Sequence, residues 1–175
     1  MRINAITLAN WFVDKAESEK NMPSYSNELT VLRLVKLVYI AYGFTLAIAD
    51  RNVLDERFDK VEAWKFGPVI PSVYFSFRHN QSSRIVNCEG FVVEKGNGFE
   101  WKIPKLADDE EDIECILNYV WNRYIDCDAK KLVSILHMNG TPWSKYFIPG
   151  QNREIPENAT KEYYKTLVNV ILGKE

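Results

Sequence analysis

Hydrophobic residues recur at spacings of three and four through most of the chain, and this pattern predicts a mainly helical protein. From Ile3 to Glu19 the apolar side chains at positions 6, 9, 13 and 16 share one face, which is typical of an amphipathic helix. A second helix is expected from Thr30 to Ala49, where apolar residues cover nearly the whole circumference. A helix of that kind belongs in the centre of a bundle.

The apolar stretch from residue 31 to residue 49 is also long enough to suggest a membrane span. It contains Arg33 and Lys36, and both charges would be costly at bilayer depth. A buried central helix is therefore the favoured interpretation. Gly43 costs about 1 kcal/mol relative to alanine inside a helix, so we expect it to permit a close contact with another helix.

The middle of the chain changes from helical to alternating spacing. Residues 61–65 are predicted to form a short strand, followed by a Gly67-Pro68 turn in which Gly67 takes a positive φ. Pro71 lacks an N–H and therefore suits the first turn of a helix, which is expected to reach His79. Residues 85–86 and 91–103 are expected to be extended, the latter as a small hairpin that turns at residues 95–98.

Helical spacing returns in the C-terminal part. One helix is expected over residues 109–124, and a second over residues 129–137 with Asp128 as its N-cap. A short aromatic segment follows, and prolines keep the next stretch irregular. The last helix is predicted to be capped by Thr160 and to end near Leu172.

Composition agrees with a soluble globular protein, since 46% of the residues are hydrophobic and 26% are charged. There is no internal repeat, low-complexity tract or long linker, so residues 1–175 are expected to form one domain. The expected fold class is α+β and predominantly helical: a compact helical bundle with a small antiparallel hairpin. Aromatic residues are abundant, at 13%, and would suit either a core or an interface.

Charge and cysteine usage narrow the setting. The net charge of −2 and pI near 5.8 argue against a broad nucleic-acid surface. Cys88, Cys115 and Cys127 have no CxxC spacing, which speaks against a disulfide framework or zinc site and favours the cytoplasm. The N-terminus lacks a signal-peptide pattern, which also favours the cytoplasm. The acidic run at residues 108–112 suits a helix start, or alternatively a lure for a basic partner.

Catalytic patterns are sparse. There is no phosphate-binding glycine loop, HExxH or GxSxG sequence. His137 and Ser134 could share a helical face as a catalytic pair, but a structural role for His137 is favoured. Cys88 is expected to be a small hydrophobe rather than a nucleophile, and His79 to cap a helix end. We therefore expect no enzymatic activity, and predict no catalytic, cofactor-binding or metal-binding residues.

The sequence leaves two alternatives open for Glu62. It could form an ion pair with Arg33 or Lys36, or it could face a partner.

A nucleic-acid groove would need a cluster of basic residues beside stacking aromatics. The candidates for it are Lys60, Arg78, His79, Arg84, Phe75 and Phe77, but no recognisable nucleic-acid-binding motif accompanies them.

Three sequence blocks, in this order, resemble the Panacea domain, a family that includes SocA-like antitoxins and phage-associated GepA-like proteins. They are LRLVKLVYIAYGFTLA at residues 32–47, EAWKFGPVIPSVY at residues 62–74 and LVSILHMNGTPW at residues 132–143. The middle block is the most specific of the three. The hairpin at residues 91–103 and the tail after Trp143 match no fixed part of the pattern, and toxin choice could be encoded there.

The resemblance implies an antitoxin that neutralises a cognate protein toxin by direct contact. One relative acts as an adaptor that delivers its toxin to a cytoplasmic AAA+ protease, so delivery is an alternative mechanism. A nucleic-acid-binding regulator and a small hydrolase are alternatives of a different class, and the oligomeric state is left open. The candidate partner-binding residues are Glu62, Trp64, Lys65, Tyr74, Phe75, Arg78, Trp101, His137, Trp143 and Tyr146, with Tyr25 as a further possible aromatic anchor.

Overall fold

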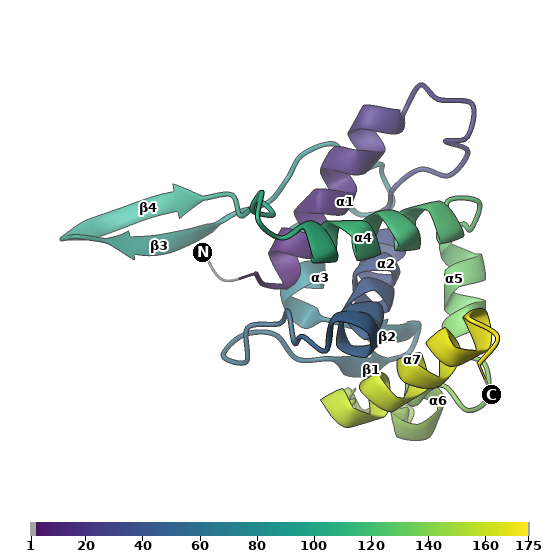
Figure 1. Ribbon diagram of the computed structural model, residues 1–175. Helices are drawn as coiled ribbons and strands as arrows, with labels where there is room; N and C mark the ends of the chain where they lie inside the picture. Colours follow the sequence, from purple (N-terminus) through teal and green to yellow (C-terminus); the bar gives the residue numbers. More distant parts are fainter. Residues whose placement is uncertain (1–2, 175) are drawn as a thin grey trace.

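A computed structural model describes residues 3–174, with helix α2 (Val31–Phe44) at the centre of the fold (Figure 1). The Thr30 side chain caps α2 by accepting a hydrogen bond from the Arg33 N–H, and the helix continues as the π-helical turn η1 (Thr45–Ala49). Every α2 residue except Leu32 is buried. The helix is long and apolar enough to span a membrane, but 83% of its most apolar stretch is buried inside the protein, as expected for a core helix.

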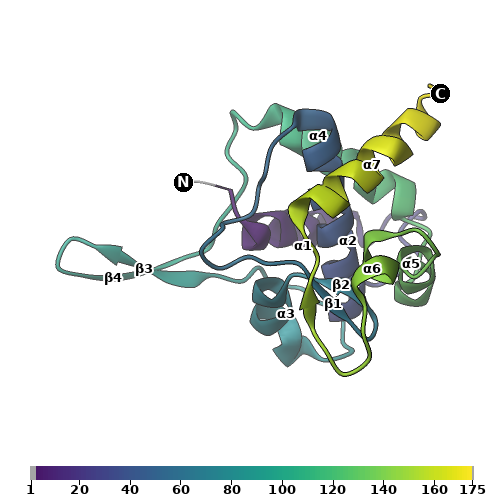
Figure 2. The same cartoon turned by 90° about the horizontal axis from the view of Figure 1, so that it is seen from below.

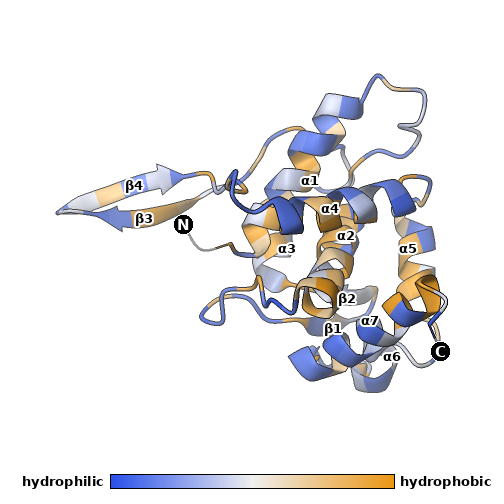
Figure 3. Cartoon of the chain, viewed as in Figure 1, coloured by the Kyte–Doolittle hydropathy of each residue, from blue (hydrophilic) through white to orange (hydrophobic). Residues whose placement is uncertain are grey.

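The remaining helices surround α2 and confirm the predominantly helical α+β class. Figure 3 shows apolar residues gathered on α2 and polar residues on the outer faces of α4 and α7. Their bounds are α1 (Ala5–Glu19), α3 (Pro71–Phe77), α4 (Glu111–Tyr124), α5 (Ala129–Leu136), α6 (Pro142–Tyr146) and α7 (Glu157–Ile171). A 3-10 turn, η2 (Arg78–Asn80), extends α3.

Several predicted helix starts are confirmed. Asp128 caps α5 by accepting from the Lys131 N–H, and Pro71 occupies the first turn of α3. The acidic run leads into the first turn of α4, as its helix-start interpretation expects. Arg51 donates hydrogen bonds to Glu110 and Asp112, so part of that run is already paired within the chain.

The close approach predicted at Gly43 is confirmed. A Cβ placed on Gly43 would lie 2.2 Å from Cε2 of Tyr164, whose buried ring comes from α7. Only a residue without a side chain lets α7 pack against α2 at this point. The predicted cap of α7 is wrong, because the helix already starts at Glu157 after Pro156, whose φ of −60° suits a helix start. Thr160 is instead buried inside α7, with its hydroxyl 3.5 Å from that of Tyr39.

A small antiparallel sheet lies beside the helices, with strand order β2-β1-β5. Strand β1 (Glu62–Trp64) pairs with β2 (Gly67–Val69) and β5 (Arg153–Glu154). Because Trp64 pairs with Gly67, the turn consists of Lys65 and Phe66, and the predicted Gly67-Pro68 turn is wrong by two residues. Gly67 does take a positive φ, of 101°, as expected.

Two extended segments were assigned wrongly from the sequence. Residues 85–86 form no strand: Ile85 is buried, and its N–H donates to the carbonyl of Leu29 in a neighbouring loop. The stretch after α6, which was expected to be irregular, contains β5. Arg153 and Glu154 pair with β1, and the Ile155 N–H donates to the carbonyl of Val61. Neither pairing can be read from local spacing, since both partners are distant in sequence.

The predicted hairpin is confirmed as β3 (Phe91–Lys95) and β4 (Gly98–Lys102), which together we call the arm. In Figures 1 and 2 the arm projects away from the helices. Asn10 of α1 holds its base: the amide donates to the carbonyls of Glu89 (2.8 Å) and Pro104 (2.9 Å) and accepts from the Glu89 N–H. The arm is therefore an extension fixed at its root, rather than a hairpin packed among the helices.

Candidate functional site

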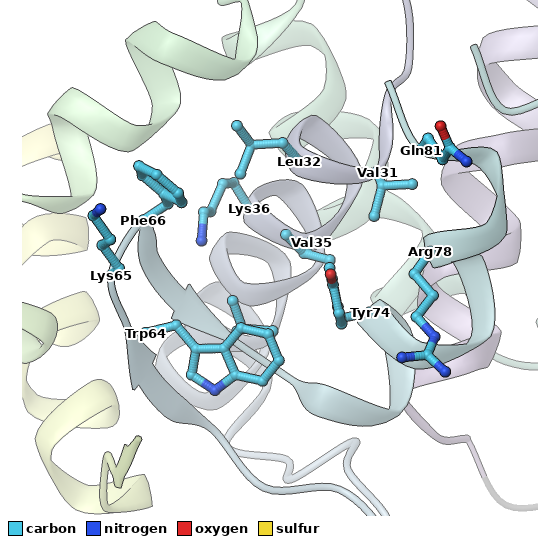
Figure 4. A pocket seen from close by; sticks show the side chains of 11 residues that line it. Val31, Leu32, Val35, Lys36, Trp64, Lys65, Phe66, Tyr74, Arg78 and Gln81 are labelled. Carbon is cyan, nitrogen blue, oxygen red and sulfur yellow. The ribbon is translucent and has the colours of Figure 1, made fainter. Parts of the chain in front are cut away.

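A cavity of about 350 Å³ opens between the N-terminal half of α2, the turn of the β1–β2 hairpin and α3 (Figure 4). We call it the signature groove because residues of the two N-terminal motif blocks form most of it. Its lining residues are Val31, Leu32, Val35, Lys36, Trp64, Lys65, Phe66, Val69, Tyr74, Arg78 and Gln81. Most of these side chains are apolar, and none is acidic.

An aromatic cluster forms one wall of the signature groove. The Trp64 ring meets Tyr74 edge to face at 5.0 Å between centroids, and Phe75 lies 5.4 Å from Tyr74. Pro71 sets the start of α3, which brings Tyr74 and Arg78 to the same helical face one turn apart. Phe75 is 54% exposed, whereas Trp64 and Tyr74 are half-buried. The wall therefore consists of two packed rings with a solvent-exposed ring at its edge.

The ion pair of Glu62 with Arg33 or Lys36, one of the two alternatives for this residue, is not formed. Glu62 Oε2 accepts a hydrogen bond from Trp64 Nε1 at 2.7 Å, which fixes the indole ring. Arg33 instead donates to backbone carbonyls in the loop before α2 and at or just after the end of α4, those of Asn27, Tyr124, Ile125 and Cys127. Backbone carbonyls, rather than a carboxylate, accept the hydrogen bonds of Arg33 and Lys36. The spacing of residues in the sequence does not reveal these partners.

Lys36 is the unusual charge in the signature groove. Its Nζ donates to the carbonyl of Pro68 at 2.9 Å, and within residues 3–174 it has no acidic partner. The residue is fully buried, and loss of solvation lowers its pKa from 10.5 to about 7. Figure 4 shows its side chain between those of Phe66 and Trp64.

His137 and Trp143, from the third motif block, lie behind the β1–β2 hairpin. Their rings stack at 3.6 Å with an interplanar angle of 3°, and Trp143 Nε1 donates to the Trp64 carbonyl at 2.8 Å. A Cβ on Gly67 would lie 3.1 Å from Lys36 Nζ and 3.5 Å from His137 Nε2. The block therefore supports the hairpin from behind, and a side chain at position 67 would disturb that support.

The candidate catalytic pair is not assembled. Ser134 Oγ donates to the Lys130 carbonyl, and buried His137 Nε2 has no hydrogen-bond partner among the described residues. Burial and the nearby Lys36 charge lower the pKa of His137. Cys88 packs beside α1 with its thiol 3.2 Å from Asp14 Oδ1, and burial raises its pKa to about 12, which makes it a poor nucleophile.

The basic cluster considered for nucleic acid is not assembled either. Arg84 pairs with Glu17, and Lys60 lies 3.7 Å from Glu154. His79 lies in η2, which extends α3, with Nδ1 3.1 Å from the Ser76 carbonyl, as its capping interpretation expects. Among residues 3–174 no group of three or more His, Cys, Asp or Glu side chains is placed to hold a metal ion.

The structure brings six of the ten candidate residues to the signature groove or its edge: Glu62, Trp64, Lys65, Tyr74, Phe75 and Arg78. Trp101 is 60% exposed but lies on the arm, and Tyr146 is half-buried on α6. Tyr25 is no open anchor, because its ring stacks on Trp121 and its hydroxyl accepts from the Leu29 N–H.

The groove residues that were not among the candidates include Leu32, Lys36 and Phe66. Phe66 is 57% exposed at the tip of the hairpin, where a large aromatic residue has no core to join. Its position directly after Trp64-Lys65 was the available signal, but the turn had been placed too late in the chain. Lys36 was recognised as part of a motif, without any indication that its charge would lie at the groove.

We expect the buried charge of Lys36 to make stability depend on pH. Its pKa is about 7 in the folded protein and near 10.5 when unfolded, so between these values the unfolded state binds more protons and stability rises with pH. Relative to Lys36→Met, the free energy of unfolding of the wild type should rise by about 2 kcal/mol between pH 7 and pH 9. Urea unfolding of both proteins across this range measures the difference, and parallel profiles would contradict the assignment.

The amino-acid sequence is similar to those of known proteins. The profile of the family described as "Antitoxin SocA-like, Panacea domain" matches residues 34–144. The chain is also 32% identical, over 145 residues, to the protein named Antitoxin SocA from Caulobacter vibrioides (strain NA1000 / CB15N). That alignment covers 81% of this chain and 69% of the relative. No solved structure matches the chain.

Proposed function

We propose a function that proceeds from one premise: the chain belongs to the family of SocA-like antitoxins with a Panacea domain. It acts in the cytoplasm as the antitoxin of a toxin–antitoxin pair, and it neutralises its cognate protein toxin by binding it directly. The toxin binds at the signature groove, and this binding is sufficient to block the activity of the toxin.

The main support for this proposal is the exposed apolar surface at the signature groove. Leu32, Phe66 and Phe75 are 36%, 57% and 54% exposed, and they stand next to the half-buried rings of Trp64 and Tyr74. Clustered exposed apolar residues mark protein interaction sites, and aromatic and arginine anchors supply most of the binding energy at interfaces. Arg78, 5.0 Å from the Phe75 ring, adds such a cation at the edge.

The arm supplies a second contact in this proposal. Val92 pairs with Trp101 across the two strands, and Phe99, two residues before Trp101, lies on the same face of the arm. All three are exposed, at 59%, 60% and 76%. Because this apolar face projects away from the helices, it can contact a partner that is bound in the groove. The arm lies outside the motif blocks, so its residues could determine which toxin is bound.

Catalysis has no part in the proposed mechanism. The Ser134 hydroxyl is bonded to its own helix, and Cys88 has a raised pKa beside Asp14. The conspicuous motif residues His137 and Trp143 are used in stacking behind the hairpin. These contacts support binding rather than bond chemistry.

The test begins with the protein encoded next to this chain, produced with it and assayed for co-purification. Phe66→Ser is then expected to weaken binding by about 30-fold, as for an interface anchor worth about 2 kcal/mol. Phe58→Ser is the matched control, because Phe58 is 71% exposed and lines no part of the groove. Trp101→Ser measures the contribution of the arm. Equal dissociation constants for Phe66→Ser and Phe58→Ser would contradict the proposed surface.

The half-life of the toxin distinguishes masking from delivery. Masking predicts that this chain leaves the half-life of its toxin unchanged or lengthens it. A half-life shortened only when an AAA+ protease is present would replace masking by delivery.

A further inference from the structure

The charges around the signature groove are one-sided. Lys36, Lys65 and Arg78 line it, and no Asp or Glu among residues 3–174 does, although the chain as a whole carries a net charge of −2. Lys65 Nζ lies 5.4 Å from the Phe66 ring, and Arg78 lies 5.0 Å from the Phe75 ring. An apolar floor with cations at its base and rim favours a partner that is apolar and acidic.

The Lys36 charge is the least compensated of the three. A buried ammonium ion is costly unless a carboxylate neutralises it, and its one hydrogen bond goes to the Pro68 carbonyl. A hydrophobic residue of similar length would fill the same space without that cost. No acidic side chain in the described part of the chain is therefore placed to stabilise this cation.

The charged groups facing Lys36 from the surrounding elements do not supply it. The β1–β2 turn contributes Lys65, η2 contributes Arg78, and the residue after α5 is His137, whose Nε2 faces the same space over Gly67. The acid of the middle motif block, Glu62 on β1, accepts a hydrogen bond from Trp64 Nε1. Within residues 3–174, the other groups named at this site are cations or can become cations.

We propose that the signature groove binds a toxin segment in which an apolar side chain stands next to an aspartate or glutamate, whose carboxylate neutralises Lys36. This inference rests on the proposed function, and it adds the chemistry of the partner. The apolar side chain packs between Leu32, Val35 and Tyr74, while the carboxylate lies toward Lys65 and Lys36. The Lys36 side chain is buried in the free protein, so the carboxylate stabilises its charge by electrostatic attraction through the low-dielectric wall of the groove. The hydrogen bond from Lys36 Nζ to the Pro68 carbonyl is kept.

The proposal links binding to proton uptake. A carboxylate beside Lys36 favours its charged form and raises its pKa above the free value of about 7. Binding then takes up a proton between the free and the bound pKa. Affinity should be constant below pH 7 and should fall by up to about tenfold for each pH unit above it.

A small probe tests the carboxylate preference without any toxin. We suggest 3-phenylpropionate, with the uncharged 3-phenylpropionamide as its match, titrated into the whole chain and followed by NMR of ¹³C-labelled lysine Cε. The acid should bind wild type about tenfold or more tightly than the amide, and it should raise the pKa of Lys36. Lys36→Met should bind both compounds equally. Lys60→Met, outside the groove, should behave as wild type.

The outcomes are separable. Equal binding of acid and amide to wild type, no binding of either, or a preference that survives in Lys36→Met would each overturn this inference. With the toxin, loss of the pH dependence of affinity in Lys36→Met supports it, and a wild-type affinity independent of pH between 7 and 8.5 contradicts it. Failure of any neighbouring gene product to bind the wild type contradicts the proposed function instead, whatever the probe shows.

Discussion

Replacing Arg33 by methionine is expected to lower the free energy of unfolding by about 4 kcal/mol, as for other broken buried charge networks. Arg33 is 1% exposed and joins α2 to the loop that follows α4. Its Nε donates to the Cys127 carbonyl at 3.0 Å, and Nη2 donates to the Ile125 carbonyl at 2.9 Å. Methionine keeps the apolar stem but removes these donors, and the Ile125 carbonyl then keeps only its bond from Asn27 Nδ2.

Arg33 also compensates the end of α4. Its guanidinium lies 5.4 Å from the centroid of the Trp121 ring and bonds carbonyls at the helix C-terminus, where a positive charge is favoured. Urea unfolding with a constant m-value measures the loss. Arg33→Lys should recover only part of it, since one ammonium ion cannot reach all four carbonyls. A loss below about 1 kcal/mol in Arg33→Met would show that water replaces these bonds easily.

Gly43→Ala is expected to destabilise the protein by about 3 kcal/mol, although alanine is the better helix former by about 1 kcal/mol. The added Cβ would lie 2.2 Å from Cε2 of Tyr164 and 2.3 Å from its Cδ2. The ring cannot yield, because it is 2% exposed and packed edge to face against Phe44 at 5.1 Å and Tyr39 at 6.1 Å. Helix α7 would have to move away from α2.

A double-mutant cycle isolates this clash. Tyr164→Ala alone should cost about 3–5 kcal/mol as a large-to-small core substitution. In that background Gly43→Ala should cost nothing further, because the space that its methyl group needs has been vacated. Thermal or urea unfolding of the four proteins gives the coupling energy. Additive costs would mean that the methyl group is accommodated by some movement other than displacement of Tyr164.

The helices could be predicted because their evidence is local. The nearly uniform apolar character of residues 31–49 indicated a central helix, and Asp128 and Pro71 marked the starts of α5 and α3. The errors concern pairing over distance. Strand β5 exists because the backbone of Arg153 reaches Ala63, and the hairpin turn moved to Lys65-Phe66 because Trp64 pairs with Gly67. No periodicity encodes such partners.

The candidate site was predictable in part for the same reason. The middle motif block and the residue after it contain Trp64, Tyr74 and Phe75, which the structure brings together through one hairpin and one helix. The third block lies behind the hairpin, because His137 stacks on Trp143 instead of facing outward. Whether an aromatic residue in a motif binds a partner or supports the backbone depends on what covers it, and only the fold reveals that.

The central claim is that the signature groove neutralises a toxin by contact. Growth of cells that express the neighbouring gene product tests it most directly, with this chain supplied as wild type, as Phe66→Ser/Phe75→Ser or as Phe58→Ser. Both groove positions are exposed, at 57% and 54%, so the double variant should fold normally. We predict that wild type and Phe58→Ser restore growth and that the double variant does not. Full rescue by the double variant, at equal protein levels, would contradict the account.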